Sequence, residues 1–95
     1  MTINIQYIHM TTSETMNDYV TDKLEKLHQK YDWIISAEVH FEAEKDVKIC
    51  KMELSAPGPR IFAASKEDNY EDAVKHTIKD LEKQLNKRKH TFSTH

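Results

Sequence analysis

Hydrophobic and polar residues alternate in four stretches of the chain, and each stretch predicts a β-strand with one buried face. The four stretches are residues 2–10, 37–44, 47–55 and 61–65. In the third stretch Val47 and Ile49 have the opposite parity to Cys50, which predicts a bulge or a change of exposed face near Ile49. Lys45-Asp46 is expected to turn the chain between the second and third strands, and Pro57-Gly58-Pro59 is expected to end the third.

Two longer stretches have apolar residues three and four positions apart, the pattern of an amphipathic α-helix. The apolar stripe of the first consists of Met16, Val20, Leu24, Leu27 and Tyr31. The stripe of the second consists of Tyr70, Ala73, Val74, Thr77, Ile78, Leu81 and Leu85. Thr12 or Ser13 is expected to cap the first helix, and Asp68 the second, with Glu71 completing a capping box.

This order of elements predicts an α+β fold, a two-layer β-α-β-β-β-α sandwich in which both helices cover one face of a four-stranded sheet. Short links favour an antiparallel meander of the last three strands. The helix after the first strand favours a parallel pairing for that strand, because a crossover returns the chain to the same end of the sheet. A length of 95 residues suits a single domain over residues 1–95, with residues 90–95 as a flexible tail.

The composition excludes several classes of protein. No apolar run approaches the roughly 20 residues that span a bilayer, and the N-terminus lacks the build of a signal peptide, so we expect a cytoplasmic protein with no membrane contact. The single cysteine, Cys50, excludes an intramolecular disulfide framework. Its parity in the strand predicts a small buried hydrophobic residue rather than a nucleophile.

Positive charge is concentrated in the two predicted helices, although the net charge of the chain is −2. In the first helix it follows one flank of the apolar stripe, and we call Lys23, Lys26 and Lys30 the first basic strip. The second helix carries what we call the second basic strip, Lys75, Lys79, Lys83, Lys87, Arg88 and Lys89. If the helices pack side by side, the strips can flank one groove, with Asp72 and Glu82 as the nearby acids. Because clustered Lys and Arg gain affinity from counterion release, these strips point to the phosphates of a nucleic acid.

Other interpretations of the charged surface remain open. Lysines on one exposed helix face most often serve solubility alone. A binding module of another kind would use the opposite face of the sheet to hold a basic protein partner. The alternating pattern places four acids on that face, namely Glu38, Glu42, Glu44 and Glu53. Of the aromatic residues, Tyr19 and Phe62 lie off the core stripes, so either can stack on a base, although half-buried packing is the more common role of such residues.

The residues that carry catalytic chemistry form no recognisable motif. The chain has no glycine-rich phosphate loop and no nucleophile elbow. Its six histidines lack paired ligand spacing beyond the loose pair His90 and His95. We therefore expect no enzyme activity, no cofactor and no metal site.

Motifs along nearly the whole chain resemble those of one known family. They are Ile3-Asn4-Ile5, Ser13-Glu14, Val20-x-x-Lys23-Leu24-x-Lys26-Leu27, Pro57-Gly58-Pro59, Asp68-x-Tyr70-x-x-Ala73-Val74 and Leu81-Glu82-Lys83-Gln84-Leu85-x-Lys87. The last motif is the most specific. The family is that of the ribosome hibernation promoting factors and ribosome-associated inhibitor A, also called sigma-factor modulation proteins.

This resemblance implies a fold similar to a double-stranded-RNA-binding domain and a role in translation. Family membership implies binding to small-subunit (16S-type) ribosomal RNA in the channel used by messenger and transfer RNA, which blocks translation under stress or in stationary phase. The ribosomal-RNA contacts of the family correspond to Lys23 and Lys26, with Lys30, on the first helix. On the second helix they correspond to Lys83 and Lys87, extended by Arg88 and Lys89.

The C-terminal end of the chain also bears on the expected partners. Long members of the family carry a further dimerisation domain that pairs whole ribosomes, whereas this chain stops at His95 and looks like a short form. We therefore expect a protein that is monomeric off the ribosome and that silences single ribosomes or depends on a separate ribosome-dimerising factor.

Overall fold

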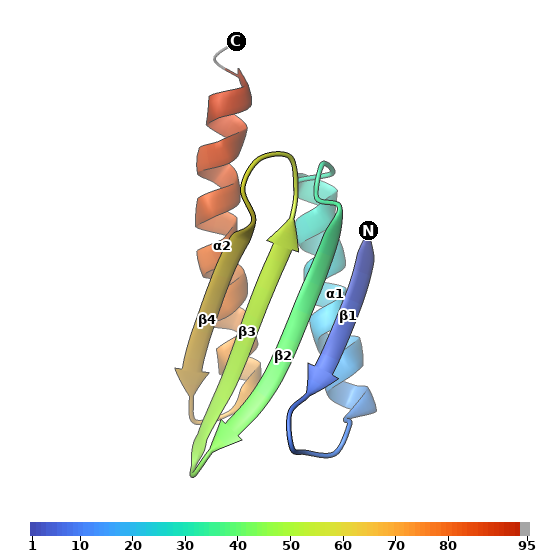
Figure 1. The fold of residues 1–95 in the computed structure, drawn as a ribbon, viewed down its shortest axis with the longest axis vertical. Helices are drawn as coiled ribbons and strands as arrows, with labels where there is room; N and C mark the ends of the chain where they lie inside the picture. Colours follow the sequence, from blue (N-terminus) through green and yellow to red (C-terminus); the bar gives the residue numbers. More distant parts are fainter. Residues whose placement is uncertain (94–95) are drawn as a thin grey trace.

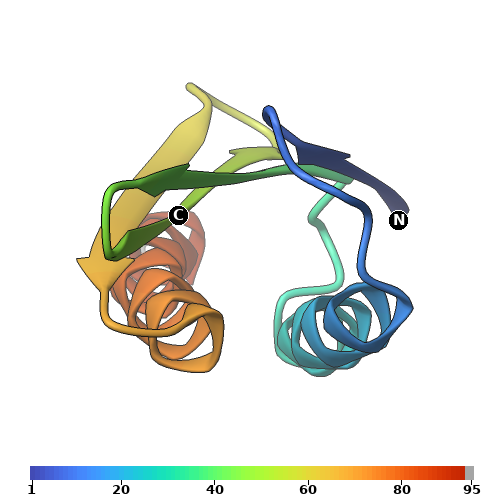
Figure 2. The same ribbon diagram turned by 90° about the horizontal axis from the view of Figure 1, so that it is seen from below.

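The structure, a computed structural model, describes residues 1–93 and has the predicted order of elements. The elements are β1 Thr2–Tyr7, α1 Glu14–Lys30, β2 Ser36–Glu44, β3 Val47–Ser55, β4 Ile61–Glu67 and α2 Tyr70–Ser93. Both helices lie on the same face of the sheet, side by side (Figures 1 and 2). The predicted two-layer α+β sandwich is therefore confirmed. Within residues 1–93, no helix is long and apolar enough to cross a membrane.

The four strands lie in the order β1-β2-β3-β4. β1 pairs in parallel with β2, from Thr2 opposite Ser36 to Tyr7 opposite Phe41, after the crossover through α1. The β2-β3 and β3-β4 pairs are antiparallel. This confirms both pairings predicted from the lengths of the connections, since a tight turn reverses the chain and a helical crossover does not.

The core fills the space between the sheet and the two helices. From α1 and its C-cap it receives Val20, Leu24, Leu27 and Tyr31, all buried, while Met16 of the predicted stripe is partly buried against this cluster. From α2 it receives Ala73, Val74, Thr77, Leu81 and Leu85, also buried. At the helix-to-strand junction, Trp33 packs against the edge of this cluster and contacts the Tyr31 ring edge-on.

Of the two predicted helix N-caps, the one of α1 is confirmed and the one of α2 is wrong. The Ser13 hydroxyl accepts a hydrogen bond from the Met16 N–H at 3.2 Å, so Ser13 is the N-cap of α1 as predicted. For α2 the prediction of Asp68 is wrong. The Asn69 side-chain oxygen accepts the Asp72 N–H at 2.8 Å, and its amide donates back to the Asp72 carboxylate at 3.0 Å. The cap moves one residue because Asn, like Asp, satisfies the free N–H groups of the first turn.

Three local predictions for the sheet also need correction. β1 ends at Tyr7 rather than residue 10, since His9 has φ of 57° and cannot continue a strand. Of the two alternatives predicted near Ile49, the bulge is wrong, because the β2-β3 register runs without interruption through Ile49 opposite Glu42. Ile49 is buried on the outer face of the sheet instead. Ala43, whose parity in the alternating stretch 37–44 predicts a core position, is exposed beside the Lys45-Asp46 turn, where the hairpin extends past the helices (Figure 1).

The predicted tail is partly helical. α2 continues through Ser93, and its last turns extend beyond the end of the sheet (Figure 1). Residues 94 and 95 lie outside the described residues, and the flexibility of the tail stays a prediction. As a result, α2 presents positive side chains over a greater length than the sheet beneath it.

Cys50 is fully buried in the core, which confirms its predicted role as a small hydrophobic residue. Burial raises the pKa of its thiol from 9.0 to about 12, because the thiolate is poorly solvated there. A raised pKa in the folded state stabilises the fold below the ordinary thiol pKa, and this contribution is lost as the pH rises from about 9 toward 12.

We expect the Cys50 thiol of the native protein to react with a thiol reagent at pH 8 only as fast as the protein opens. In urea the same thiol should react at once, because the unfolded chain exposes it. An Ala64→Cys variant in a Cys50→Ala background is the matched control, since Ala64 is exposed on β4. Fast reaction of the native wild-type protein would contradict the burial of the thiol.

Candidate nucleic-acid interface

The first basic strip lies on the flank of α1 that faces α2. Its geometry follows from the i, i+3 and i+7 spacing of Lys23, Lys26 and Lys30 on one helix. The Lys23 ammonium lies 5.4 Å from the centre of the Tyr19 ring, and the Lys26 ammonium lies 3.1 Å from the Asp22 carboxylate. The Lys30 ammonium donates a hydrogen bond of 2.8 Å to Glu82 on α2. All three cations therefore lie along the junction of the two helices.

Two hollows lie over this junction. The first, of about 140 Å³, is lined by Lys23, Lys26, Leu27, Lys30, Ile78 and Glu82. The second, of about 440 Å³, is lined by Lys30, Tyr31, Lys79, Glu82, Lys83 and Asn86. They share Lys30 and Glu82, so together they form one shallow groove between the helices with five lysines and one acid on its walls. We call it the interhelix groove.

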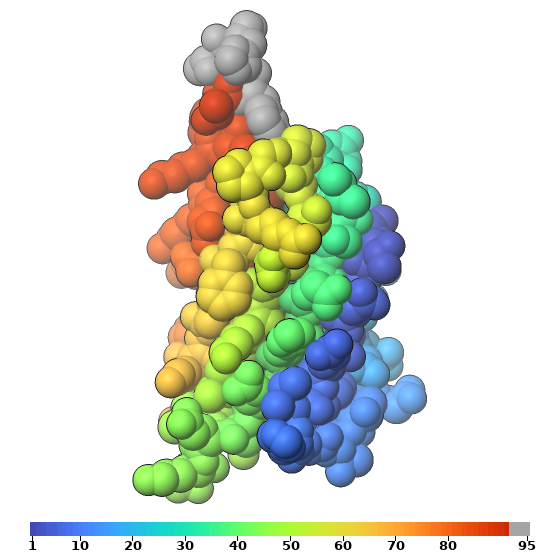
Figure 3. Space-filling view, viewed as in Figure 1, coloured from blue at the N-terminus to red at the C-terminus, as the bar shows by residue number. Residues whose placement is uncertain are grey.

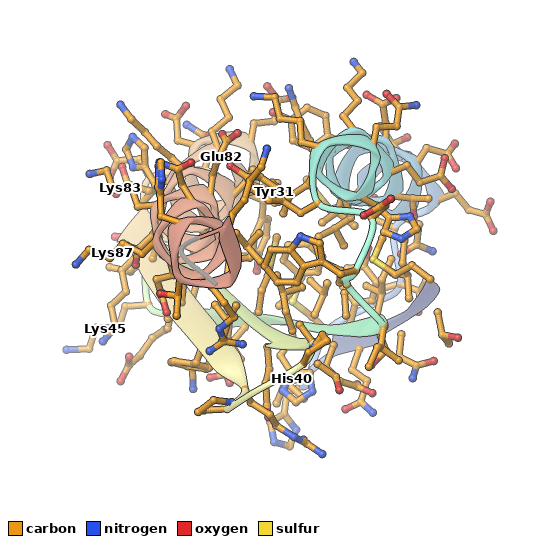
Figure 4. The ribbon with its side chains drawn as sticks, turned by 90° about the horizontal axis from the view of Figure 1, so that it is seen from above. Tyr31, His40, Lys45, Glu82, Lys83 and Lys87 are labelled. Atoms are coloured by element: carbon orange, nitrogen blue, oxygen red, sulfur yellow. The ribbon has the colours of Figure 1, made fainter. Side chains whose placement is uncertain are left out.

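The second basic strip is spread around α2 rather than turned toward α1. Lys79 and Lys83 line the interhelix groove and also a hollow on the β4 side of α2, with Ser65, His76 and Asp80. Figure 4 shows Lys83 and Lys87 pointing away from α1, whereas Glu82 and Tyr31 lie between the helices. Lys75, Lys79, Lys83 and Lys87 are all exposed. The prediction that both strips flank one groove therefore holds for Lys79 and Lys83 but not for Lys87.

The two last members of the second strip contact the rest of the fold. Arg88 donates a hydrogen bond of 3.1 Å from Nη1 to the Pro57 carbonyl oxygen. Its guanidinium also packs over Gly58, whose φ of 97° is a conformation that glycine adopts without strain. The Lys89 ammonium lies 5.9 Å from the centre of the Tyr31 ring. Arg88 therefore couples the end of α2 to the β3-β4 turn, a structural role that the charge pattern did not reveal.

The two acids near the groove, Asp72 and Glu82, have different roles. Asp72 belongs to the N-terminal cap of α2, where its carboxylate accepts the Asn69 amide. Glu82 instead reaches across to α1 and is the only acid among the residues that line the interhelix groove. Sequence reasoning placed Glu82 near the groove but missed its bond to Lys30, because no local pattern relates positions 52 residues apart.

The outer face of the sheet carries the predicted acids, but they are paired within the face. The ion pairs are Glu42 with Lys51 at 3.1 Å, Glu53 with Arg60 at 2.9 Å and Glu44 with Lys66 at 3.9 Å. Glu38 accepts a hydrogen bond from the Asn4 amide. Figure 3 views this face, on which Phe62 is 55% exposed. The acids are thus largely balanced by neighbouring cations, which leaves little negative charge to attract a basic partner.

The two aromatic residues singled out in the sequence lie on different layers. Tyr19 is half-buried against the core, and its hydroxyl is buried without a hydrogen-bond partner among the described residues. Phe62 lies on the outer sheet face, away from both basic strips. Nothing in the arrangement places Phe62 beside the interhelix groove. Across residues 1–93, no group of three or more His, Cys, Asp or Glu side chains is placed to hold a metal ion.

Comparison with known proteins gives consistent results over the full length of the fold. The model of the family described as sigma 54 modulation protein / S30EA ribosomal protein matches residues 3–92. A ribosome hibernation promoting factor of Klebsiella oxytoca is 30% identical over 95 residues, which cover 100% of each chain. One of Pseudomonas putida is 27% identical over 89 residues, which cover 94% of this chain and 87% of the relative.

Two solved structures have a fold similar to that of this chain. A ribosomal subunit interface protein from Coxiella burnetii superposes with a TM-score of 0.88 at 26% identity, covering 94% of this chain and 98% of the other. The N-terminal domain of Protein Y from Thermus thermophilus, at 19% identity, shares the fold with a TM-score of 0.83 and coverage of 92% and 98%. By the match of its sequence and its fold, the chain belongs to the sigma 54 modulation protein / S30EA ribosomal protein family, which includes the ribosome hibernation promoting factors.

Proposed function

We propose that this protein is a cytoplasmic ribosome hibernation factor without catalytic activity. It binds small-subunit ribosomal RNA in the channel used by messenger and transfer RNA, and it inhibits translation under stress or in stationary phase. Membership of the family supports the ribosomal role, and relatives that match 87% to 100% of their own length are named ribosome hibernation promoting factors. Off the ribosome we propose a monomer, with any pairing of ribosomes left to a separate factor.

The observation that carries the proposal is the cluster of lysines along the junction of the two helices, where five lysines and one acid line the interhelix groove. The helix layer presents both basic strips, whereas the acids of the outer sheet face lie on the opposite side of the sheet and are paired there. A protein with a net charge of −2 can bind a polyanion through such a face, because local potential rather than net charge steers the encounter. Contact through the helices also leaves the outer sheet face free of the RNA.

The proposal is tested by neutralising exposed lysines of α2. The variant carries Gln at three positions that we call the α2 triple, Lys79, Lys83 and Lys87. We expect its affinity for purified small ribosomal subunits to fall by roughly tenfold or more, and the dependence of log K on log salt to flatten by about two to three units. Each lost phosphate contact removes about one released counterion, which is the reason for the flatter slope.

A matched control separates this site from a general effect of charge. Lys51→Gln, Arg60→Gln and Lys66→Gln change the net charge by the same amount on the outer sheet face. We expect this control to bind as the wild type does. Equal loss in both variants would contradict a helix-layer interface, and loss in the control alone would favour binding through the sheet face.

A further inference from the structure

Glu82 holds the central position in the interhelix groove. Its carboxylate lies on the wall shared by both hollows, and Lys23, Lys26, Lys30, Lys79 and Lys83 line the same groove. Figure 4 shows Glu82 between the helices, while Lys83 points outward. The carboxylate therefore lies where the positive potential of both strips overlaps, which is also the position that would attract a phosphate most strongly.

The contact between Glu82 and Lys30 is short but exposed to solvent. The ammonium and carboxylate are 2.8 Å apart, with 68% of the Lys30 side chain and 36% of the Glu82 side chain exposed. The hydrogen bond to Glu82 and the negative charge of that carboxylate raise the pKa of Lys30, so the lysine stays charged. Exposed ion pairs of this kind are weak, because water screens both charges, so a competing anion can separate them at little cost.

We propose that Glu82 sets the affinity of this protein for RNA by acting as an internal substitute for a phosphate. In the free protein its carboxylate occupies Lys30, and on binding a phosphate of the RNA backbone takes that place while Glu82 turns toward solvent. Both groups are anionic oxygen acceptors for the same ammonium, so they compete for it. This inference rests on the proposed function, because it assumes that the interhelix groove contacts RNA.

The test removes the carboxylate but keeps the shape of the side chain. Glu82→Gln is expected to bind small ribosomal subunits about three- to tenfold more tightly than the wild type, since one competitor and one repulsive charge are lost. Its salt slope should stay close to that of the wild type, because Lys30 displaces the counterion of the same phosphate in both proteins. Unchanged or weaker binding would overturn the inference.

A second variant provides the control for net charge. Glu25→Gln makes the same change of charge on the exposed side of α1, and Glu25 does not line the groove. We expect its binding to match the wild type. If Glu25→Gln tightens binding as much as Glu82→Gln does, the effect is one of overall charge, and the specific role of Glu82 is rejected.

A double-mutant cycle with Lys30→Gln identifies the lysine through which Glu82 acts. In the Lys30→Gln background, the gain from Glu82→Gln should fall to less than about twofold, because the competition has no target. A gain that persists in full would show that Glu82 does not act through Lys30. Circular dichroism and urea unfolding of each variant check that the helices stay packed.

The role of Glu82 and the proposed function can be tested separately. If the wild type does not bind small ribosomal subunits, the proposed function fails, and the wild type and the same variants are titrated with inorganic polyphosphate. We expect the same order of affinities for polyphosphate, with Glu82→Gln binding most tightly. Equal affinities of wild type and Glu82→Gln for polyphosphate would reject the role of Glu82 as a substitute for phosphate.

Discussion

Neutralising the first basic strip together with the α2 triple is expected to weaken binding to small ribosomal subunits by roughly a thousandfold at about 200 mM salt. The six positions changed to Gln are Lys23, Lys26, Lys30, Lys79, Lys83 and Lys87. Six phosphate contacts correspond to a salt slope of about −4 to −5, so their loss should flatten the dependence of binding on salt by about that amount. Filter binding or sedimentation over a range of salt concentrations measures both quantities.

The contribution of each helix can be separated in the same experiment. If one RNA surface contacts both helices, each triple variant should lose part of the affinity and part of the slope, and the losses should add approximately. A first-strip variant that binds like the wild type would contradict a contact through the interhelix groove. The fold should survive, because the contacts of Lys23, Lys26 and Lys30 are solvent-screened surface interactions that contribute little to stability.

Replacing Phe41 by Ala is expected to lower the free energy of unfolding by about 3 to 5 kcal/mol. Phe41 is fully buried on β2, where its ring stacks on Tyr7 at 5.2 Å and meets Tyr70 edge-on at 5.4 Å between ring centres. Its removal leaves a cavity between the sheet and the start of α2, and it also removes two aromatic contacts. Urea unfolding followed by circular dichroism measures the change as a shift of the midpoint.

Phe62→Ala is the matched control for this loss. Phe62 is also a phenylalanine in a strand, but it is 55% exposed on the outer sheet face, so we expect a change within about 0.5 kcal/mol. If Phe41→Ala does not fold, Phe41→Leu keeps most of the volume and should cost roughly 1 to 2 kcal/mol. Similar midpoints for Phe41→Ala and Phe62→Ala would contradict the packing described for this core.

Two contacts that fix α2 on the sheet connect the stability of the fold with the proposed interface. The Tyr70 hydroxyl donates to the Glu42 carbonyl oxygen at 3.0 Å, and its ring packs on Phe41, so the first turn of α2 is fixed to β2. Arg88 anchors the other end through Pro57. The backbone of α2 between these anchors is therefore fixed on the sheet, and this pre-organisation of the helix reduces the entropy lost when its lysines bind phosphates.

Local sequence patterns predicted most of the fold. The alternation of residues in the strands and the stripes Val20-Leu24-Leu27 and Val74-Leu81-Leu85 placed nearly every core residue correctly. The wrong predictions lie at positions where a local sequence rule is compatible with two structures. Asn69 and Asp68 are both good caps, and Ile49 is an apolar residue on the mostly polar outer face, where the unbroken register with β2 places it.

Helix and strand periodicity predicted most of the residues that face the core and the lysines on the exposed sides of both helices, because periodicity sets the direction of each side chain locally. Which charges meet depends on tertiary packing. The contacts of Lys30 with Glu82 and of Arg88 with Pro57 depend on how both helices lie across the sheet. That placement results from strand order and core packing, which join residues far apart in the chain and leave no periodic trace in the sequence.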